Sequence, residues 1–301
     1  MQKRKSFLRR YGNDYFFLAP WLLVFVGFTV IPIALAVGFS FTDFDMVQLP
    51  HFVGVDNYLQ LFLADDIFIK ALVNTLYFAV ITGPLGYLLS FVIGWLINDL
   101  GRVPRTILTF LFYSPSLLGA SYTMWLYFFS GDNYGLLNSA LQGLGLTDAP
   151  IQWLTDPSYD MFTVIVVVLW GSMGTGFLSF VAGFQSLNRS YYEAGAIDGI
   201  RDRWQELWYI TLPQMLPQLL IGAVLTISGS FAIGAQCSAL TGFPSTDYST
   251  HTLVLHIQDY GLLRLEMGYA CTVAVVLFII MVTVWIAIDK AIRALGNGGK
   301  T

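Results

Sequence analysis

The sequence predicts an all-α integral membrane protein with six transmembrane helices, and three observations support this fold class. The chain of 301 residues is 56% hydrophobic and only 11% charged, whereas a soluble domain carries about a quarter charged residues. Six apolar runs are long enough to cross a hydrocarbon layer about 30 Å thick, which takes roughly 20 helical residues. Lys and Arg gather in alternate loops between these runs, as they do in membrane proteins with a defined orientation.

The six apolar runs define the predicted helices in order. We expect spans at residues 16–39, 71–97, 107–130, 161–184, 216–241 and 267–288. The first run is long, contains Pro20 and Pro32, and lacks a small-residue cleavage site, so we expect a retained span and no cleaved signal peptide. Cys237 and Cys271 both fall in predicted spans, where a free cysteine behaves as a small apolar residue. No disulfide framework or metal site is expected from them.

The distribution of positive residues predicts the orientation. Short cytoplasmic loops retain Lys and Arg, and with the amino terminus inside, 13 of the 15 Lys and Arg residues lie in cytoplasmic segments. Only Lys70 and Arg264 lie outside. We therefore expect both termini in the cytoplasm, with a basic arm at 1–15, the six-helix domain at 16–292 and a tail at 293–301.

Two segments on the outer side have some predicted structure. Pro50 and Gly54 indicate a turn, and the residues that follow have the pattern of one short amphipathic helix on the outer surface. The segment 131–157 is rich in glycine and contains Trp153. It is either an ordered cap or a docking surface, and its composition is compatible with both.

Several function classes lack the residues that they require. The predicted span cores hold no Asp, Glu, Lys, Arg or His, although proton- and ion-coupled carriers usually keep such a group at membrane depth. The carboxyl-terminal GNGGKT only superficially resembles a phosphate-binding loop, because the first glycine, the strand and the helix of that motif are missing. His51, His251 and His256 are not spaced as metal ligands, and we expect satisfied surface or loop histidines. No catalytic constellation and no nucleic-acid site is expected.

The segment 191–217 is unusual because it is charged and aromatic, yet it lies between two apolar runs on the cytoplasmic side. We expect a first helix at 190–200, with Ser190 as its cap and Glu193 in its first turn, near the positive helix end. Small residues then form a flat face that another surface can approach: Ala194, Gly195 and Ala196. Gly199 can end the helix in a left-handed conformation.

A second short helix is expected at 202–209, which would bring Trp204 and Trp208 to the membrane interface. Pro213 and Pro217 then introduce the next span, because proline is tolerated in a first helical turn. We call the segment 191–217 the elbow. Its residues alone leave two interpretations open, a lipid-surface anchor or a docking site for a partner.

The elbow also resembles the cytoplasmic signature of binding-protein-dependent ABC importer permeases. The residues that match are Glu193-Ala194-Gly195, Asp198-Gly199 and Ile210-Thr211-Leu212-Pro213. In that family the motif forms a coupling helix, which docks in a groove of the ATPase subunit, so the resemblance assigns ATPase coupling to the loop 188–213. Gly195 replaces the usual second alanine. One extra residue separates Gly199 from Ile210, and we expect a bulge or longer turn at 200–203.

The resemblance covers nearly the whole chain and is most similar to the carbohydrate branch. Supporting stretches are FVGVDNYLQLF, YGLLN and LTGFPSTDYSTHTLVLHI, which resemble the first of two permeases in multiple-sugar and maltose-type importers. After Leu-Thr this chain has Gly242-Phe243-Pro244 where the family has Gly-Gly-Gly-Pro. This departure falls in a loop that the resemblance places opposite the binding protein.

The resemblance implies a permease fold of the type I ABC importers in the bacterial inner membrane. The implied partners are a second permease, an ATPase dimer and an extracytoplasmic solute-binding protein. This chain would then be no enzyme and hold no cofactor, because ATP and Mg would be bound by the ATPase. A neutral carbohydrate is the expected solute.

The expected solute path follows uncharged aromatic, hydroxyl and amide side chains in the third to fifth spans. Such groups stack on sugars or hydrogen-bond to them, although they also serve as packing contacts between helices. The candidates are Tyr122, Trp125, Trp170, Ser172, Ser228, Ser230 and Gln236. An importer of another solute, such as a polyol, glycerol phosphate or amino acid, remains an alternative, as does a stand-alone secondary carrier.

Overall fold

The computed structural model describes residues 17–117 and 122–297, and this part of the chain is built from helices. Its β pairing is confined to one isolated bridge between Thr42 and Phe52. Four helical segments are long and apolar enough to cross a bilayer: Phe17–Phe39, Asp66–Asn98, Asp160–Ser186 and Met267–Ala291. A fifth candidate joins Arg203–Gln214 to Leu216–Phe231 across a bend of 81°.

The chain divides into two compact units. The first consists of Met1–Ala64 and Ile257–Val276, and the second of Asp65–His256 and Leu277–Thr301. The final helix α16 (Met267–Asn297) begins in the first unit and continues into the second. It extends beyond the predicted span at 267–288 and into the predicted tail at 293–301.

In the first unit, a long apolar helix is followed by a tightly bonded turn. The helix runs from Phe17 to Phe39 and includes a π-helical turn, η1 (Val26–Val30), and α2 (Ile31–Phe39). The predicted amphipathic helix is present as α3 (Asp56–Leu63). Its Asn57 donates to the carbonyl oxygens of Ser40 at 3.0 Å and Thr42 at 2.8 Å, which ties α3 to the end of α2. A π-helical turn, η4 (Asp259–Leu263), precedes α16.

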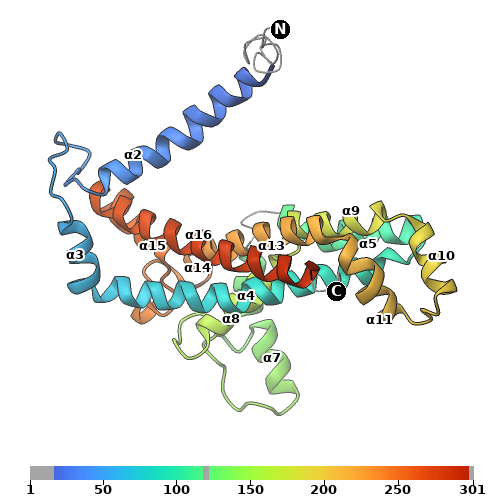
Figure 1. Ribbon diagram of the computed structural model, residues 1–301. Helices are drawn as coiled ribbons and strands as arrows, with labels where there is room; N and C mark the ends of the chain where they lie inside the picture. Colours follow the sequence, from blue (N-terminus) through green and yellow to red (C-terminus); the bar gives the residue numbers. More distant parts are fainter. Residues whose placement is uncertain (1–16, 118–121, 298–301) are drawn as a thin grey trace, which may run out of the picture. The chain divides into compact units, whose positions relative to one another are not determined.

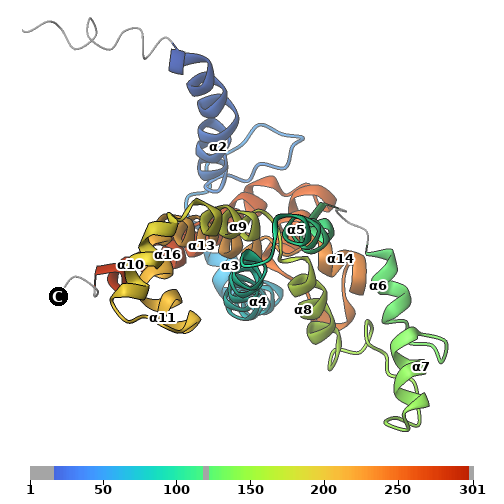
Figure 2. The ribbon, with the colours of Figure 1, turned by 90° about the vertical axis from the view of Figure 1, so that its right-hand side faces the viewer.

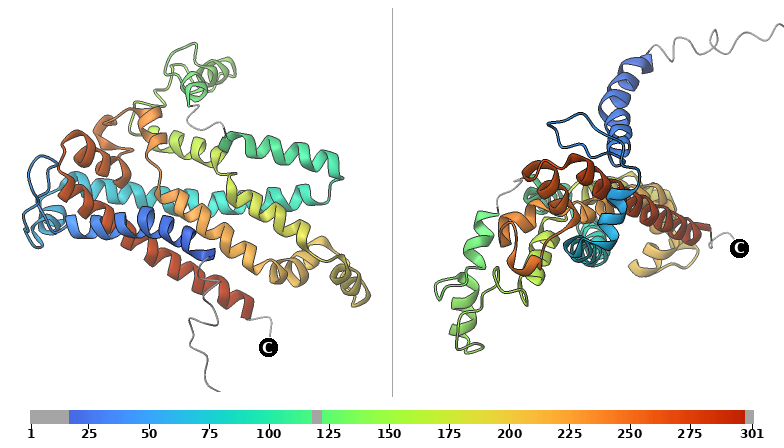
Figure 3. Two further views of the ribbon diagram at one scale, coloured as in Figure 1. Left: turned by 90° about the horizontal axis from the view of Figure 1, so that it is seen from above. Right: turned by 90° about the vertical axis from the view of Figure 1, so that its left-hand side faces the viewer.

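The second unit holds the remaining helices (Figure 1). They are α4 (Asp66–Asn98), α5 (Arg102–Leu117), α6 (Thr123–Phe128), α7 (Leu136–Gly143), α8 (Asp160–Gly171), α9 (Thr175–Ser186), α10 (Arg189–Ile197), α11 (Arg203–Glu206), the π-helical η2 (Leu207–Thr211), α12 (Leu212–Gln214), α13 (Leu216–Phe231), α14 (Ala235–Thr241), the 3-10 turn η3 (Thr246–Tyr248) and α15 (Leu253–Gln258). Figure 3 shows α5 running back beside α4 after a short turn.

Helices α4, α9 and α13 pack against one another and form the centre of this unit (Figure 2). Glycines allow the close approach, since a side chain at each of these positions would meet the neighbouring helix. A Cβ at Gly222 of α13 would lie 2.4 Å from the Phe180 ring of α9, and one at Gly86 of α4 would lie 3.0 Å from Cβ of Ser172. Small residues serve this purpose in membrane proteins, where close van der Waals packing drives helix association.

The predicted spans correspond to the structure in different ways. The second and sixth match the continuous helices α4 and α16. The third, at 107–130, is represented by α5 and α6 on either side of residues 118–121, which lie outside the described residues. The fourth and fifth are interrupted, at 172–174 between α8 and α9 and at 232–234 between α13 and α14. The number of six spans therefore stays a prediction.

The segment 131–157 is an ordered structure that contains α7, built around one buried amide. Asn138 is fully buried; its amide nitrogen donates to the carbonyl oxygens of Ser130 and Ile151, both at 3.1 Å. Its Oδ1 accepts from the Ile151 N–H at 3.1 Å and from Nε1 of Trp153 at 2.9 Å. A buried polar group with all its partners specifies one arrangement of the surrounding loops.

Candidate functional site

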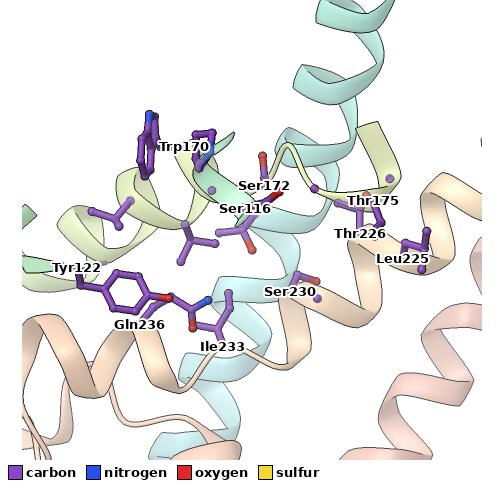
Figure 4. A pocket seen from close by; sticks show the side chains of 18 of the residues that line it. Ser116, Tyr122, Trp170, Ser172, Thr175, Leu225, Thr226, Ser230, Ile233 and Gln236 are labelled. Atoms are coloured by element: carbon purple, nitrogen blue, oxygen red, sulfur yellow. The ribbon is translucent and has the colours of Figure 1, made fainter. Parts of the chain in front are cut away.

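A polar pocket of about 390 Å³ lies in the second unit, where α8, α9, α13 and α14 begin or end. Among the residues that line it are six of the seven predicted path residues: Tyr122, Trp125, Trp170, Ser172, Ser230 and Gln236. Figure 4 shows the hydroxyl groups of Ser116, Ser172, Thr175, Thr226 and Ser230, which come from several helices. Among the described residues, no Asp, Glu, Lys, Arg or His lines this pocket.

The two helix interruptions create the pocket. α8 ends at Gly171 and α9 starts at Thr175, so Ser172 and Gly174 line the pocket in non-helical backbone. The second interruption needs Gly234, because a Cβ there would lie 2.7 Å from Cγ1 of Val254. Irregular backbone at membrane depth is tolerated where it borders a cavity or is buried in protein.

Several hydroxyl groups of the pocket donate their protons in hydrogen bonds to backbone carbonyl oxygens three or four residues earlier. Ser172 donates to the carbonyl oxygen of Leu169 and Ser230 to that of Ile227, both at 2.7 Å. Thr226 donates in the same way to Gly222 at 2.9 Å. A hydroxyl has two acceptor lone pairs besides its one proton. These side chains therefore offer acceptors to a solute that brings its own O–H donors.

The aromatic residues form the other wall of the pocket. The rings of Trp125 and Trp170 lie 5.1 Å apart at an interplanar angle of 76°. Nε1 of Trp125 is buried, and no described residue accepts a hydrogen bond from it. This indole N–H and the amide of Gln236 are donors that a solute could use, and the indole faces suit the stacking of a sugar ring.

The pocket includes six of the predicted path residues, leaves out the seventh, and is also lined by residues that were not predicted. Ser228 is exposed on α13 and does not line the pocket, because it lies on a different face of the helix from Ser230. Thr226 lines it and was missed, although its spacing of four residues from Ser230 places both on one helix face. Thr82, Ser116 and Thr175 were also missed. Nothing in the local sequence distinguishes these three from ordinary packing residues.

The elbow forms at the end of the second unit where α4 ends (Figure 1). Its first helix, α10, is capped by Asn188, whose Oδ1 accepts from the Ser190 N–H at 3.0 Å. The predicted cap Ser190 is therefore wrong. Asn and Ser are similarly good caps, so residue type alone does not distinguish Asn188 from Ser190. Gly199 ends the helix with a φ of +94°, as predicted.

The carboxyl end of α10 is a Schellman motif. The N–H of Ile200 donates to the carbonyl oxygen of Gly195 at 2.9 Å, and that of Gly199 to Ala196 at 3.4 Å. Gly195 is buried beneath Ile210, and a Cβ on Gly195 would lie 2.6 Å from Cδ1 of that isoleucine. Gly195 of the predicted small face is thus turned inward, and this contact joins two parts of the sequence motif to each other.

The remaining motif residues divide between the surface and the core. Glu193, Ala194, Asp198 and Pro213 are exposed, and Ile197 beside them is 87% exposed. Leu212 packs against the buried cluster of Phe91, Phe180, Phe184, Leu207 and Met215. The elbow therefore presents Glu193 outward while it remains attached to the helices that carry the pocket.

Further contacts hold the elbow to the end of α4. Arg203 forms an ion pair with Asp99, and its guanidinium lies 4.9 Å from the ring centroid of Trp95. Trp204 packs on the same ring at 5.0 Å. Closer to α10, the Tyr192 hydroxyl shares a hydrogen bond of 2.9 Å with Thr211. Burial raises the pKa of Tyr192, so the hydroxyl stays neutral in this contact.

A π-helical turn precedes the end of the motif. η2 covers Leu207–Thr211, and the N–H of Leu212 donates to Leu207, five residues earlier. A π turn holds one residue more than the corresponding α-helical turn, and such turns are often found at functional sites. The predicted bulge at 200–203 falls largely in the non-helical connection at 198–202 between α10 and α11, although Arg203 already belongs to α11. η2 is a second place where an extra residue is accommodated.

One of the three histidines differs from the prediction of surface or loop positions. His51 is an exposed loop residue near Asp43, and His251 also lies in a loop, as expected. His256 lies in α15; it and His251 are buried, and their facing ring nitrogens are 3.3 Å apart. This burial was not predictable from the local sequence, because it depends on α4, which is distant in the chain. No group of three His, Cys, Asp or Glu residues in the described part of the chain could hold a metal ion.

Comparisons with known proteins identify the family. The family model described as "Binding-protein-dependent transport system inner membrane component" matches residues 66–293. The probable ABC transporter permease protein YesP of Bacillus subtilis is 30% identical, with 93% of this chain and 90% of that protein covered. The lactose transport system permease protein LacF of Rhizobium radiobacter is 28% identical, with 93% and 94% covered.

Another relative and a solved structure agree with this. The multiple sugar-binding transport system permease protein MsmF of Streptococcus mutans is 29% identical, with 92% of this chain and 93% of that protein covered. A chain in the crystal structure of a bacterial alginate ABC transporter, in complex with an alginate pentasaccharide-bound periplasmic protein, has a TM-score of 0.78 at 21% identity. It covers 98% of this chain and 99% of its own length, so the two share a fold.

These matches confirm the family that the elbow motif predicts. ATP hydrolysis in such transporters belongs to a separate subunit. The chain belongs to the family of binding-protein-dependent transport system inner membrane components and is a multi-pass membrane subunit of an ABC transporter.

Proposed function

We propose that this chain is one of two permease subunits of an ATP-driven importer for a neutral sugar or oligosaccharide. It forms the translocation path together with the second permease, receives the solute from an external binding protein, and is coupled to the ATPase through the loop 193–213. In this proposal the chain has six spans and both termini in the cytoplasm. The observation that carries it is the uncharged, hydroxyl-rich pocket with two indole rings.

The size and chemistry of the pocket support a neutral polyhydroxylated solute. Its volume of about 390 Å³ is in the range of small-molecule sites, roughly 300–1,000 Å³. A phosphate or carboxylate would lose its hydration there. It would meet hydroxyl groups whose protons already form hydrogen bonds with backbone carbonyl oxygens, as at Ser172 and Ser230. Burying an unpaired charge is costly, whereas sugar hydroxyls can donate to these oxygens. Two relatives are named for lactose and multiple-sugar transport.

Contacts at two positions along α4 support the placement of two loops on opposite sides of the membrane: the loop that contains Tyr248 and His251, and the elbow. Asn74 of α4 binds the carbonyl oxygens of Tyr248 and His251, and Trp95 of the same helix lies under Arg203 of the elbow. The 21 residues between Asn74 and Trp95 span about 30 Å at 1.5 Å per residue. This is about the thickness of the hydrocarbon core.

The contacts of the elbow support a mechanical role. A force on exposed Glu193 reaches α4 through Arg203 and reaches the core cluster through Leu212. Phe180 of that cluster lies on α9, and Met215 directly precedes α13. Both helices also contribute residues to the pocket. Movement of the elbow by the ATPase would therefore be transmitted to the wall of the pocket.

The first experiment tests the solute and the pocket together. The chain is reconstituted in proteoliposomes with a second permease, the ATPase and a binding protein, and uptake is measured for neutral sugars, polyols, sugar phosphates and amino acids. We expect ATP-dependent uptake of a neutral sugar. Ser230→Ala should raise the half-saturating solute concentration about two- to tenfold, the value of one hydrogen bond. Ser228→Ala is the matched control, because Ser228 lies off the pocket on the same helix.

The opposite results would refute the proposal. Uptake of only charged solutes would exclude the neutral-sugar assignment. Solute accumulation by this chain alone, without ATPase, would identify a stand-alone carrier instead.

A second experiment tests the coupling loop. Glu193 is exposed, so Glu193→Ala should not prevent folding or membrane insertion, but it should uncouple ATP hydrolysis from uptake, because the carboxylate is placed to make a charge-assisted contact with the ATPase. Ser190→Ala is the matched control, because Ser190 is an exposed residue of the same helix outside the motif; it should leave ATP hydrolysis and uptake coupled. Wild-type uptake by the assembled Glu193→Ala importer would refute the role assigned to Glu193.

A further inference from the structure

A buried row of three titratable side chains joins the start of α4 to the chain that follows α14. Nε2 of His256 lies 3.1 Å from Oδ2 of Asp65, and Nδ1 of His256 lies 3.3 Å from Nε2 of His251. His256 is 0% and His251 1% exposed, and the Asp65 side chain is 8% exposed. Asp65 also caps α4, since its Oδ1 accepts from the Phe68 N–H at 2.8 Å.

This row holds one end of the segment 241–252, which we call the outer segment. Asn74 fixes its backbone by donating to the carbonyl oxygens of Tyr248 at 3.0 Å and His251 at 2.9 Å. Oγ1 of Thr75 accepts from the Leu253 N–H at 2.8 Å, directly after the segment. Phe243, one of the residues that depart from the family pattern, stacks on the His251 ring with centroids 5.8 Å apart.

Other titratable groups surround the outer segment. From α4, Lys70 donates to the carbonyl oxygen of Asp247. From α8, Asp160 accepts from the Ser249 hydroxyl, and α14 contributes the buried Cys237. The Tyr248 ring lies edge-on to His251 at 5.3 Å. Asp65 is the carboxylate that contacts His256 directly, so it can balance one positive charge on the pair.

Protonation affects this row in two distinct steps. With no added proton or one, a donor can face an acceptor between the two imidazoles, and His256 can still donate to Asp65. With a proton added to both rings, two N–H groups face each other across 3.3 Å and two cations share one carboxylate. Like charges at this distance in a buried site cannot both be accommodated.

We propose that Asp65, His256 and His251 form a proton-sensitive latch that positions the outer segment on α4 and releases it when the surroundings become acidic. The latch thereby positions a surface that faces the binding protein, and this assignment of side rests on the proposed function. The three are positioning residues and make no contact with the transported solute. Because the closed row accommodates at most one added proton and free histidine titrates near pH 6.5, the latch stabilises the segment above that pH and loses this contribution as the pH falls.

Amide hydrogen exchange tests the latch in the full-length chain in lipid nanodiscs, between pH 7.5 and pH 5.5. After correction for the intrinsic pH dependence of exchange, the peptide that covers residues 247–255 should exchange faster at low pH. One extra proton bound on opening gives a rise of up to about tenfold per pH unit below the titration of free histidine. Peptides from the middle of α4 should not change.

Three variants separate the latch from general acid sensitivity. His251→Gln keeps a hydrogen-bonding side chain but cannot be protonated, so the pH response should disappear. Asp65→Asn keeps the acceptor that caps α4 but removes the charge, so the segment should open at a higher pH than in the wild type. His51→Gln is the matched control, because His51 is exposed and pairs with Asp43, which does not belong to the row; its response should equal that of the wild type.

The outcomes of this test are independent of transport. An unchanged exchange rate of residues 247–255 in the wild type would overturn the latch, as would a full pH response in His251→Gln. If His251→Gln does not fold, the wild type and Asp65→Asn still decide, since an unshifted response in Asp65→Asn contradicts the proposal. No solute, ATPase or second permease is present, so a failed uptake experiment leaves these results valid.

Discussion

Replacement of Gly222 by alanine tests the packing on which the pocket depends. A Cβ at this position would lie 2.4, 2.6 and 3.2 Å from three carbon atoms of the Phe180 ring. The ring is fully buried and packs edge-on against Tyr87 at 5.2 Å and Phe91 at 5.5 Å. It therefore has no free direction in which to move. We expect Gly222→Ala to push α13 away from α9 and to displace Thr226, which lines the pocket one turn later.

The magnitude follows from this overlap. Carbon atoms in contact are normally about 3.5–4.0 Å apart, so the ring and the new methyl group must separate by more than 1 Å, roughly the difference from the 2.4 Å found here. Overpacking of a filled core typically costs about 1–3 kcal/mol. Alanine regains up to about 1 kcal/mol through its higher helix propensity. With this gain subtracted in full, the net destabilisation is about 0–2 kcal/mol, and the overlap of more than 1 Å against a buried ring places it toward the upper end.

Thermal unfolding of the purified chain in detergent, followed by tryptophan fluorescence, measures this loss. At about 2–4 °C per kcal/mol, Gly222→Ala should lower the transition by several degrees. Gly229→Ala on the same helix is the control, because a Cβ there meets no atom within 4 Å; it should be neutral or slightly stabilising. Phe180→Leu combined with Gly222→Ala should recover part of the loss in a double-mutant cycle. A Gly222→Ala variant as stable as Gly229→Ala would refute the close-packing argument.

Three further substitutions have defined outcomes. Asn138→Ala leaves several buried polar groups unpaired, at about 1–3 kcal/mol for each, so limited proteolysis should cut residues 131–157 much faster, whereas exposed Asn133→Ala should change little. Arg203→Ala should destabilise the elbow by no more than about 1–2 kcal/mol, because its ion pair and its contact with Trp95 are solvent-exposed; loss of folding in thermal unfolding would contradict this. Gly199→Ala should cost about 1–2 kcal/mol, because φ is +94° there, and an unchanged melting temperature would contradict a left-handed helix end.

The elbow shows how far local sequence reasoning extends. Gly199 and the two-helix pattern were predictable, because a glycine after a polar helix commonly adopts the left-handed cap. The burial of Gly195 was not predictable, since it depends on a contact with Ile210, which lies in the second part of the elbow. Helix α11 begins with Asp202 as its cap, within the predicted segment. Its attachment to Trp95 required the position of α4.

For the pocket, too, the sequence predicted some features, and only the tertiary structure decided others. The sequence indicated the kinds of side chain that line it, because uncharged polar residues in apolar runs are uncommon enough to be noticed. It did not reveal the interruptions at 172–174 and 232–234, since both lie in continuous apolar runs. These interruptions form the pocket that Ser172 and Ser230 line. Ser228 lies outside it because it is on another face of α13.

By itself, the sequence determined the helical class, the apolar runs, the charged elbow and its family, because each of these depends on neighbouring residues or on overall composition. The tertiary structure alone decided which side chains meet: His256 with Asp65, 191 residues apart, and Gly222 with Phe180. The physical reason is that periodicity and composition act along the chain. Burial and hydrogen bonding between distant residues depend instead on how the helices pack. In a densely packed protein, a shift of one helix by a few ångströms changes whether a side chain is buried or exposed.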